Sequence, residues 1–315
     1  MRRVALIHNP VSGRQFKTRS AVLREAIAVL NGAGIETELM EATSRGSAGL
    51  HARDAVRRGF DTVLACGGDG TVHEILQCLV GTPVALGVVP FGTANALAQN
   101  LGLGTSPVKA VHWLVDAVPT EIPIGRVTYM DTDTAEERSS YFIVAAGIGL
   151  DALLMSRPDP ELKRRFGYVM YVFEVIRIWL THSFPLFCAE FTCVGSDEPQ
   201  VEQVSQVLAV RIRSFGGLLG TLAPGASLHN GKLRLMAFKT RSRLRYFRFL
   251  MAVLAGRHSF EGEIELVKAI SVECTSGEPI WVEADGEVLG VLPAKIEVSP
   301  QPLGLTLLIP RHAQP

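Results

Sequence analysis

The sequence predicts an α/β fold in two parts: a doubly wound parallel sheet, followed by a mostly antiparallel, β-rich part. Three observations support this prediction. Strand-like and helix-like segments alternate with short connections up to Pro119, strand-like runs dominate after it, and three glycine-rich turns follow strands of the first part. Alternation is typical of parallel βαβ units, whereas successive strands are typical of antiparallel sheets. We place the boundary between Pro119 and Pro123, which assigns residues 1–122 to the first part and 123–302 to the second.

The elements of the first part follow from the spacing of its apolar residues. Short apolar runs that end at a turn predict buried strands at 4–8, 35–40, 61–66 and 84–89. Apolar residues at helical spacing predict helices at 20–30, 47–58, 72–80 and 94–101. Each of the first three helices connects two strands, which gives the right order for a parallel sheet covered on both faces.

The second part is predicted to be built mainly from strands. These strands cover residues 141–146, 187–194, 204–212, 233–238, 264–273, 280–284, 294–298 and 305–309. Two helical stretches interrupt them, at 160–181 and 244–255.

Composition excludes several classes of protein. The 315 residues carry 31 Lys and Arg and 31 Asp and Glu, so no overall basic field attracts nucleic acid. Five cysteines without a C-x-x-C pair argue against a disulfide framework or a zinc site and suit a reducing cytoplasm. The longest apolar stretch, 169–180, contains Glu174 and Arg177, so it is unsuited to crossing a bilayer.

Three turns of the first part have the composition of a phosphate-binding edge. They are Asn9-Pro10-Val11-Ser12-Gly13, Gly67-Gly68-Asp69-Gly70-Thr71 and Pro90-Phe91-Gly92-Thr93-Ala94-Asn95. Carboxyl ends of parallel strands meet at one edge, where glycine lets backbone N–H groups approach phosphate oxygens. Asp69 is the carboxylate inside this cluster, placed to reach a phosphate-bound Mg²⁺. The alternative is that such turns only cap strands, but three together favour a nucleotide site.

Asp285-Gly286-Glu287 is the candidate catalytic segment of the second part. It follows the strand at 280–284, and its two carboxylates could include a general base for an attacking hydroxyl. Asp-Gly is also a common hairpin dipeptide, so a plain turn remains the alternative here. The G-x-G-x-x-A match at Gly147–Ala152 is a weaker feature, because no strand with a terminal acidic residue follows it.

Taken in order, these motifs resemble those of the diacylglycerol kinase catalytic family, which includes bacterial YegS-like lipid kinases and sphingosine and ceramide kinases. The match continues through Gly147-x-Gly149-x-Asp151-Ala152, Asn230-Gly231-x-Leu233 and Asp285-Gly286-Glu287. The resemblance implies a nucleotide domain, a β-sandwich-like lipid domain as in NAD kinases, and a return strand within residues 303–315. It implies an ATP-dependent lipid kinase that uses Mg²⁺ and transfers the γ-phosphoryl group to a diacylglycerol or sphingoid-type hydroxyl.

The resemblance also assigns roles residue by residue. Glu287 would accept the proton of the lipid hydroxyl, with Asp285 beside it and Asp69 near the metal. The nucleotide would contact Asn9, Pro10, Val11, Ser12, Gly13, Thr43, Gly67, Gly68, Asp69, Gly70, Thr71, Val72, His73, Thr93 and Asn95. Asn230 stands where related kinases carry an Asp that holds a structural Mg²⁺, and a neutral side chain weakens such a site.

Other functions and partners stay open from the sequence. A soluble-substrate kinase resembling NAD kinases and a catalytically silent nucleotide- or lipid-binding regulator are the alternatives. A homodimer is open as well. We expect a cytoplasmic protein that contacts the inner membrane face peripherally, because 241–250 mixes arginine with apolar residues at helical spacing. The same pattern would also arise from a helix that packs on the β-rich part.

Overall fold

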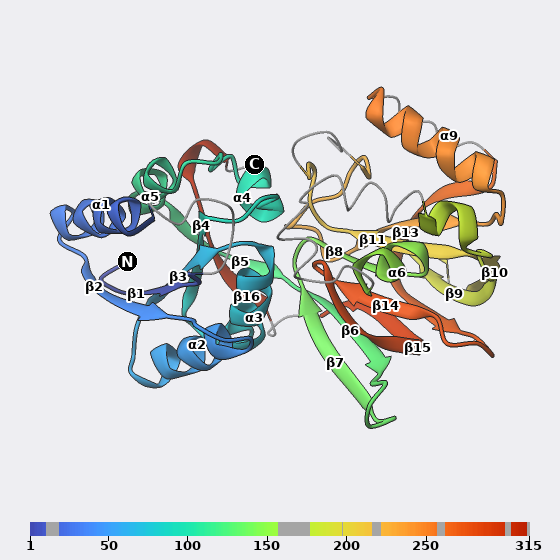
Figure 1. Ribbon diagram of the computed structural model, residues 1–315, viewed down its shortest axis with the longest axis horizontal. Helices are drawn as coiled ribbons and strands as arrows, with labels where there is room; N and C mark the ends of the chain where they lie inside the picture. Colours follow the sequence, from blue (N-terminus) through green and yellow to red (C-terminus); the bar gives the residue numbers. More distant parts are fainter. Residues whose placement is uncertain are drawn as a thin grey trace.

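The computed structural model describes residues 1–10, 19–156, 177–196, 198–215, 222–256, 262–299 and 304–313. Two lobes lie side by side, one built on a mostly parallel sheet and the other on antiparallel strands (Figure 1). This agrees with the fold class predicted from the sequence. The predicted nucleotide contacts Val11, Ser12 and Gly13 lie outside the described residues, as do positions 160–176 of the predicted helix at 160–181.

The described residues of the first lobe form a six-stranded sheet in the order β2-β1-β3-β4-β16-β5. The strands are β1 (Arg3–His8), β2 (Glu36–Glu41), β3 (Thr62–Gly67), β4 (Ala85–Pro90), β5 (Val118–Pro123) and β16 (Gly304–Ile309). The first four are parallel, β16 joins parallel to β4, and β5 runs antiparallel to β16. Thus the end of the chain returns to the first sheet and occupies a position between β4 and β5.

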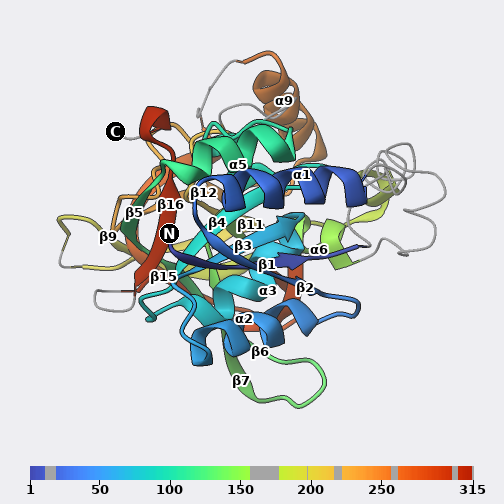
Figure 2. The ribbon, with the colours of Figure 1, turned by 90° about the vertical axis from the view of Figure 1, so that its left-hand side faces the viewer.

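Helices cover both faces of this sheet. Those of the lobe are α1 (Arg19–Gly32), α2 (Ser47–Arg57), α3 (Asp69–Leu79), α4 (Ala96–Asn100) and α5 (Pro107–Val115). Figure 2 shows α1 and α5 on one face and α2 and α3 on the other. Strands β3 and β4 are buried along their whole length, which is why their sequences are continuous apolar runs.

The described residues of the second lobe form a ten-stranded antiparallel sheet in the order β10-β9-β13-β12-β11-β8-β14-β15-β6-β7. The strands are β6 (Gly125–Met130), β7 (Glu137–Phe142), β8 (Ala145–Ile148), β9 (Phe187–Cys193), β10 (Gln200–Val204), β11 (Gln206–Val210), β12 (Leu233–Phe238), β13 (Ile264–Thr275), β14 (Trp281–Ala284) and β15 (Glu287–Val298). An additional pairing of β13 with β15 curls the sheet back on itself. The described elements also include helices α6 (Leu150–Ser156) and α9 (Arg243–Leu254), the helical residues 177–181 and a short 3₁₀ turn (Arg311–Ala313).

Two predicted strands are interrupted in the structure. Residues 141–146 are divided between β7 and β8, with Ile143 and Val144 outside both strands, and residues 204–212 are broken at Ser205. Residues 141–146 form a continuous apolar run, so periodicity gave no sign of the first break, whereas Ser205 and Gln206 interrupt the apolar pattern at the second. Backbone N–H groups of the first break bind a distant carboxylate, as described below.

The two lobes share part of one hydrophobic core. Ile143, Val144 and Ala145 of the second lobe pack in the cluster that contains the first sheet, together with Ile212 and Leu228. The first lobe therefore does not end in a free surface at this face, and the residues around the β7–β8 break are held by packing from both sides.

Candidate active site

The candidate nucleotide edge is formed where β3 and β4 end side by side. Gly67, the last residue of β3, pairs with Pro90, the last residue of β4. Helix α3 starts two residues after Gly67, and the Gly92–Asn95 turn leads from β4 into α4. Both turns therefore lie at the same carboxyl edge, where ligands of open parallel sheets bind.

Gly68 and Gly92 bring the two turns into backbone contact. A Cβ atom at Gly92 would lie 2.5 Å from the Cα of Gly68, and one at Gly68 would lie 3.3 Å from the Cα of Gly92. The φ of Gly68 is −97°, so the close approach and not a left-handed backbone requires glycine there. Side chains at these positions would separate the two turns.

Asn95 and Asp69 hold the second turn in place. Asn95 adopts a φ of 48° at the N-cap of α4, and its amide exchanges two hydrogen bonds of 2.9 Å with the backbone of Gly92. The backbone N–H of Ala96 donates to Asp69 Oδ1 at 2.8 Å. Asn95 thus stabilises the turn, while Asp69 bridges the two helix N-termini.

Burial raises the pKa of the Asp69 carboxyl, and the negative charge of Asp285 adds to this effect. The N–H of Ala96 opposes it by stabilising the carboxylate. A carboxylate whose charge is this poorly solvated gains from a bound cation, because the cation favours its ionised form. Asp69 is therefore suited to lie next to a metal ion.

The first turn, as far as Pro10, lies against the same edge. The backbone N–H of Asn9 donates to Cys66 O at 3.1 Å, and its side-chain Nδ2 donates to Thr71 Oγ1 at 3.2 Å. A Cβ atom at Gly67 would lie 2.3 Å from Thr71 Oγ1, so glycine leaves room for this threonine. The first and second glycine-rich turns are thereby joined through one hydroxyl.

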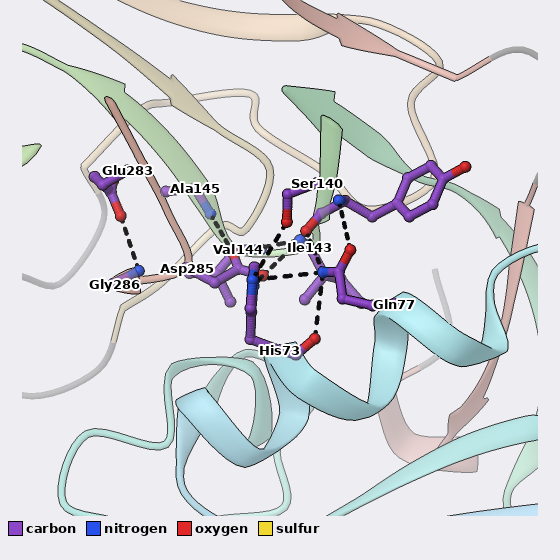
Figure 3. Close-up of polar contacts among 10 residues, drawn as sticks. His73, Gln77, Ser140, Ile143, Val144, Ala145, Glu283, Asp285 and Gly286 are labelled. Atoms are coloured by element: carbon purple, nitrogen blue, oxygen red, sulfur yellow. Dashed lines mark hydrogen bonds and ion pairs between the residues drawn. The ribbon is translucent and has the colours of Figure 1, made fainter. Parts of the chain in front are cut away.

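Asp285 is enclosed by the backbone at the β7–β8 break (Figure 3). Its carboxylate accepts hydrogen bonds from the N–H groups of Ile143, Val144 and Ala145, at 3.0, 2.8 and 3.1 Å. Its own N–H donates to Ala145 O at 2.8 Å, and its φ is 52°. The Asp285 side chain is only 3% exposed. Its main structural role is therefore to hold the bend between β7 and β8.

Helix α3 contributes two side chains to the same region, and these join the lobes. His73 Nδ1 lies 3.5 Å from Asp285 Oδ2, and its Nε2 lies 3.4 Å from Ser140 Oγ (Figure 3). Gln77 donates to Tyr141 O at 2.8 Å and accepts from Tyr141 N at 2.9 Å. Gln77 therefore pairs with β7 as a neighbouring strand would, and it fixes α3 against the second lobe.

Glu287 differs from Asp285 because it remains accessible. Its side chain is 39% exposed, and its Oε2 lies 3.2 Å from Arg45 Nη2. A Cβ atom at Gly70 would lie 2.9 Å from Glu287 Oε1, so the carboxylate contacts the first turn of α3. Glu287 thus lies where the second lobe meets the glycine-rich edge and has an oxygen within reach of solvent.

A second pair of carboxyl groups is buried behind this site. Burial raises the pKa of Asp151 to about 7 and raises that of Glu283 well above its ordinary value, with the Asp151 charge adding to the latter. Glu283 accepts from the N–H of Gly286 at 2.8 Å. A Cβ atom at Gly147 would lie 1.5 Å from Asp151 Oδ2. The G-x-G pattern therefore makes room for a buried carboxyl in this fold.

The remaining predicted site residues lie in different surroundings. Thr43 and Thr93 are exposed on loops after β2 and β4, whereas Val72 is buried in the core of the first lobe. Asn230 is exposed, and its N–H donates to Ser227 O. Among the described residues, no group of three or more His, Cys, Asp or Glu side chains is arranged to hold a metal ion.

The donor set decides which metal site fits these residues. Mg²⁺ bound to a nucleotide needs only one or two carboxylates, since phosphates and water supply the other ligands. Asp69 fits that arrangement. The exposed, neutral Asn230, without a carboxylate cluster around it in the described part of the chain, does not fit a structural Mg²⁺ site.

Four residues important to this geometry were not predicted from the sequence. Glu283 is a charged residue in an apolar strand, and Gln77 follows His73 by four positions on the same helix face, so both carried a local signal. Asp151 was noted only as part of a motif. Arg45 carried no signal, because its partner Glu287 is 242 positions away.

Comparison with known proteins agrees with this arrangement. Residues 3–127 match the diacylglycerol kinase catalytic domain, and residues 144–307 match the YegS C-terminal NAD kinase beta sandwich-like domain. A Mycobacterium tuberculosis diacylglycerol kinase is 31% identical, with 98% of this chain and 96% of the relative covered. A Bacillus subtilis diacylglycerol kinase is 28% identical over 94% of this chain and 93% of its own length.

A solved structure of a Bacillus anthracis diacylglycerol kinase has the same fold. Its TM-score is 0.71 at 18% identity, and the match covers 99% of this chain and 98% of the other. At that identity the structural similarity supports the fold, whereas the sequence relatives support the family assignment. Because these relatives are matched over nearly their whole length, in both lobes, the chain belongs to the diacylglycerol kinase family and is a lipid kinase.

Proposed function

We propose that this lipid kinase transfers the γ-phosphoryl group of ATP to the free hydroxyl of diacylglycerol, with Glu287 as proton acceptor. The observation that carries the proposal is the contact between Glu287 Oε1 and the backbone at Gly70, where a Cβ atom would lie 2.9 Å away. In this contact an accessible carboxylate of one lobe lies against the glycine-rich edge of the other, which supports the proposed role. The names of the sequence relatives favour diacylglycerol over a sphingoid-type lipid as acceptor.

The first lobe supplies the nucleotide side of the reaction. Backbone N–H groups of the Gly67–Thr71 and Gly92–Asn95 turns, at the start of α3 and α4, can bind phosphate oxygens without a side chain in the way. The positive end of the α3 dipole adds a favourable field for an anion. Thr43 and Thr93, which are exposed on the loops after β2 and β4, are the proposed further contacts.

Asp69 would hold Mg²⁺ in the nucleotide complex, directly or through water. When bound, the ion neutralises phosphate charge and favours departure of the leaving group. Phosphoryl transfer depends mainly on positioning and on electrostatic stabilisation. The hydrogen bond from the Ala96 N–H to Asp69 contributes to positioning, because it fixes the carboxylate before substrates bind.

Glu287 completes the acceptor side. Its carboxylate would take the proton of the lipid hydroxyl as the oxygen attacks the γ-phosphorus in line with the leaving ADP. Arg45 Nη2 lies 3.2 Å from Glu287 Oε2, and this contact orients the Glu287 side chain. Asp285 would support the base indirectly, by holding the β7–β8 bend and facing His73.

The proposal is tested with radiolabelled ATP and mixed micelles that contain one lipid at a time. Diacylglycerol, sphingosine, ceramide, monoacylglycerol and phosphatidylglycerol form the panel, and NAD serves as the soluble acceptor. We expect label in phosphatidate, strict dependence on Mg²⁺, and a rate at least 100-fold lower for Asp69→Asn. Asp133→Asn, an exposed carboxylate in the β6–β7 turn, is the matched control.

Each alternative function predicts a different result. Label in NAD would identify a soluble-substrate kinase. Nucleotide binding without label in any acceptor would identify a silent regulator. Equal rates for Asp69→Asn and wild type would remove Asp69 from the mechanism.

A further inference from the structure

The outer face of α9 is apolar, although it is turned to solvent. Leu244, Phe247 and Met251 are 62%, 47% and 48% exposed, and Leu250 is exposed as well. In Figure 1, α9 stands at the edge of the second lobe, away from the first lobe. Contiguous apolar side chains on a surface helix indicate a surface that binds a partner or a membrane.

The helix also has an ordinary buried face, so exposure of the other face is not a sign of loose packing. Tyr246 and Val253 are buried, and at about 100° per residue both lie roughly opposite Leu244. The Tyr246 ring stacks on Phe238 at 4.9 Å, and its hydroxyl lies 2.8 Å from Ser205 Oγ. The helix is therefore firmly placed and presents a second apolar stripe outward.

Basic side chains flank this outer stripe. Arg248 and Arg243 lie on its two sides by the same helical spacing, and Arg241 directly precedes the helix. None of these three arginines forms an ion pair within the described part of the chain, whereas Arg245 pairs with Glu263. The sequence of α9 contains no acidic residue.

The segment before β9 extends the same surface. Trp179 donates from its indole N–H to Arg243 O at 3.0 Å, and its ring lies 6.0 Å from that of Phe247. Leu180 beside it is 56% exposed. We call the set Trp179, Leu244, Phe247, Leu250 and Met251, with its flanking arginines, the α9 surface.

We propose that the α9 surface docks the enzyme on an anionic lipid bilayer, with α9 lying parallel to the membrane plane. An apolar stripe bordered by arginines is the pattern of helices that lie at the headgroup boundary, and tryptophan is enriched at that depth. Anionic headgroups would pair with the arginines. This inference rests on the proposed function, because a lipid substrate resides in such a surface.

The charges on α9 favour a membrane over a second copy of the chain. In a two-fold dimer the same patch faces itself, so the arginines of one helix would approach those of the other. With no acidic residue on the helix, nothing within it would offset that repulsion. An anionic bilayer supplies the missing negative charge.

Sedimentation of the full chain with vesicles tests the proposal. Vesicles of phosphatidylcholine alone and with about a third phosphatidylglycerol are compared, without nucleotide. We expect binding to the anionic vesicles, a loss of about tenfold or more for Phe247→Ser/Met251→Ser, and about fivefold per arginine for Arg241→Gln and Arg248→Gln. Leu50→Ser, which removes a 64% exposed leucine from α2, should bind like wild type.

Three outcomes would overturn the proposal. In the first, the wild-type protein does not bind anionic vesicles. In the second, a folded Phe247→Ser/Met251→Ser variant binds the vesicles like wild type. In the third, the wild-type protein is a dimer in ultracentrifugation, and this variant becomes a monomer while its vesicle binding stays unchanged. Circular dichroism establishes that each variant is folded, and the arginine variants test the same surface without changing its apolar side chains.

Kinase activity on short-chain diacylglycerol in detergent is measured separately. Activity without vesicle binding refutes the docking surface alone, and binding without activity refutes the proposed function.

Discussion

Replacement of Asp285 is the sharpest test of how the bend between β7 and β8 is held. The carboxylate accepts three backbone hydrogen bonds of 2.8–3.1 Å and is almost fully buried. A hydrogen bond to a charged group contributes about 1.5–3 kcal/mol, and neighbouring contributions are not additive. Asp285→Ala should therefore lower the free energy of unfolding by about 4 kcal/mol.

Two further substitutions at this position separate the contribution of the side-chain hydrogen bonds from that of the backbone conformation. Asp285→Asn keeps an acceptor at Oδ1 and tolerates the positive φ, so it should cost about 2 kcal/mol. Asp285→Gly removes the side chain but relieves the backbone, and it should be about 1 kcal/mol more stable than Asp285→Ala. Urea unfolding followed by circular dichroism measures all three against Asp133→Asn. A loss below about 1 kcal/mol for Asp285→Ala would refute the anchoring role.

Three other predictions follow from the structure. Gly68→Val should weaken ATP binding at least tenfold in calorimetry, because its side chain would separate the two turns, while Gly277→Val, in open space, should not. Gln77→Leu should raise the radius of gyration in small-angle scattering and the KM for lipid, since α3 loses both hydrogen bonds to β7; an unchanged radius and KM would show that Gln77 does not fix α3 against the second lobe. Asp151→Asn should gain about 2–3 kcal/mol of stability relative to wild type between pH 5 and pH 8. The pKa of Asp151, about 7 when folded and about 3.9 unfolded, makes wild type lose stability over that range; parallel urea midpoints of the two proteins would contradict this.

The strands of the first lobe could be predicted because burial on both faces leaves a continuous apolar run. The observed β3 and β4 differ from the predicted strands by one residue at each end. Helix α3 starts at Asp69 and not at residue 72, because Gly68 takes the N-cap position ahead of it. Helix α5 was not predicted, although Ser106 followed by Pro107 is a recognised helix start.

The break between β7 and β8 could not be predicted from local sequence. Residues 141–146 are uniformly suited to a strand, and the carboxylate that bends them lies about 140 positions away. The pairing of Arg45 with Glu287 could not be predicted for the same reason, because the two residues lie far apart in the sequence. The glycine-rich turns were recognisable because their spacing relative to strands is local, whereas contacts between lobes depend on the whole fold.

Phosphoryl transfer by Glu287→Gln tests the central claim most directly. Glutamine keeps the shape of the side chain but cannot accept the proton, and general-base catalysis contributes about 10²–10⁴-fold. The account predicts a fall of that size in the rate of phosphatidate formation and an ATP affinity within about twofold of wild type. A rate above about a tenth of wild type would contradict it and make Asp285 the next candidate base.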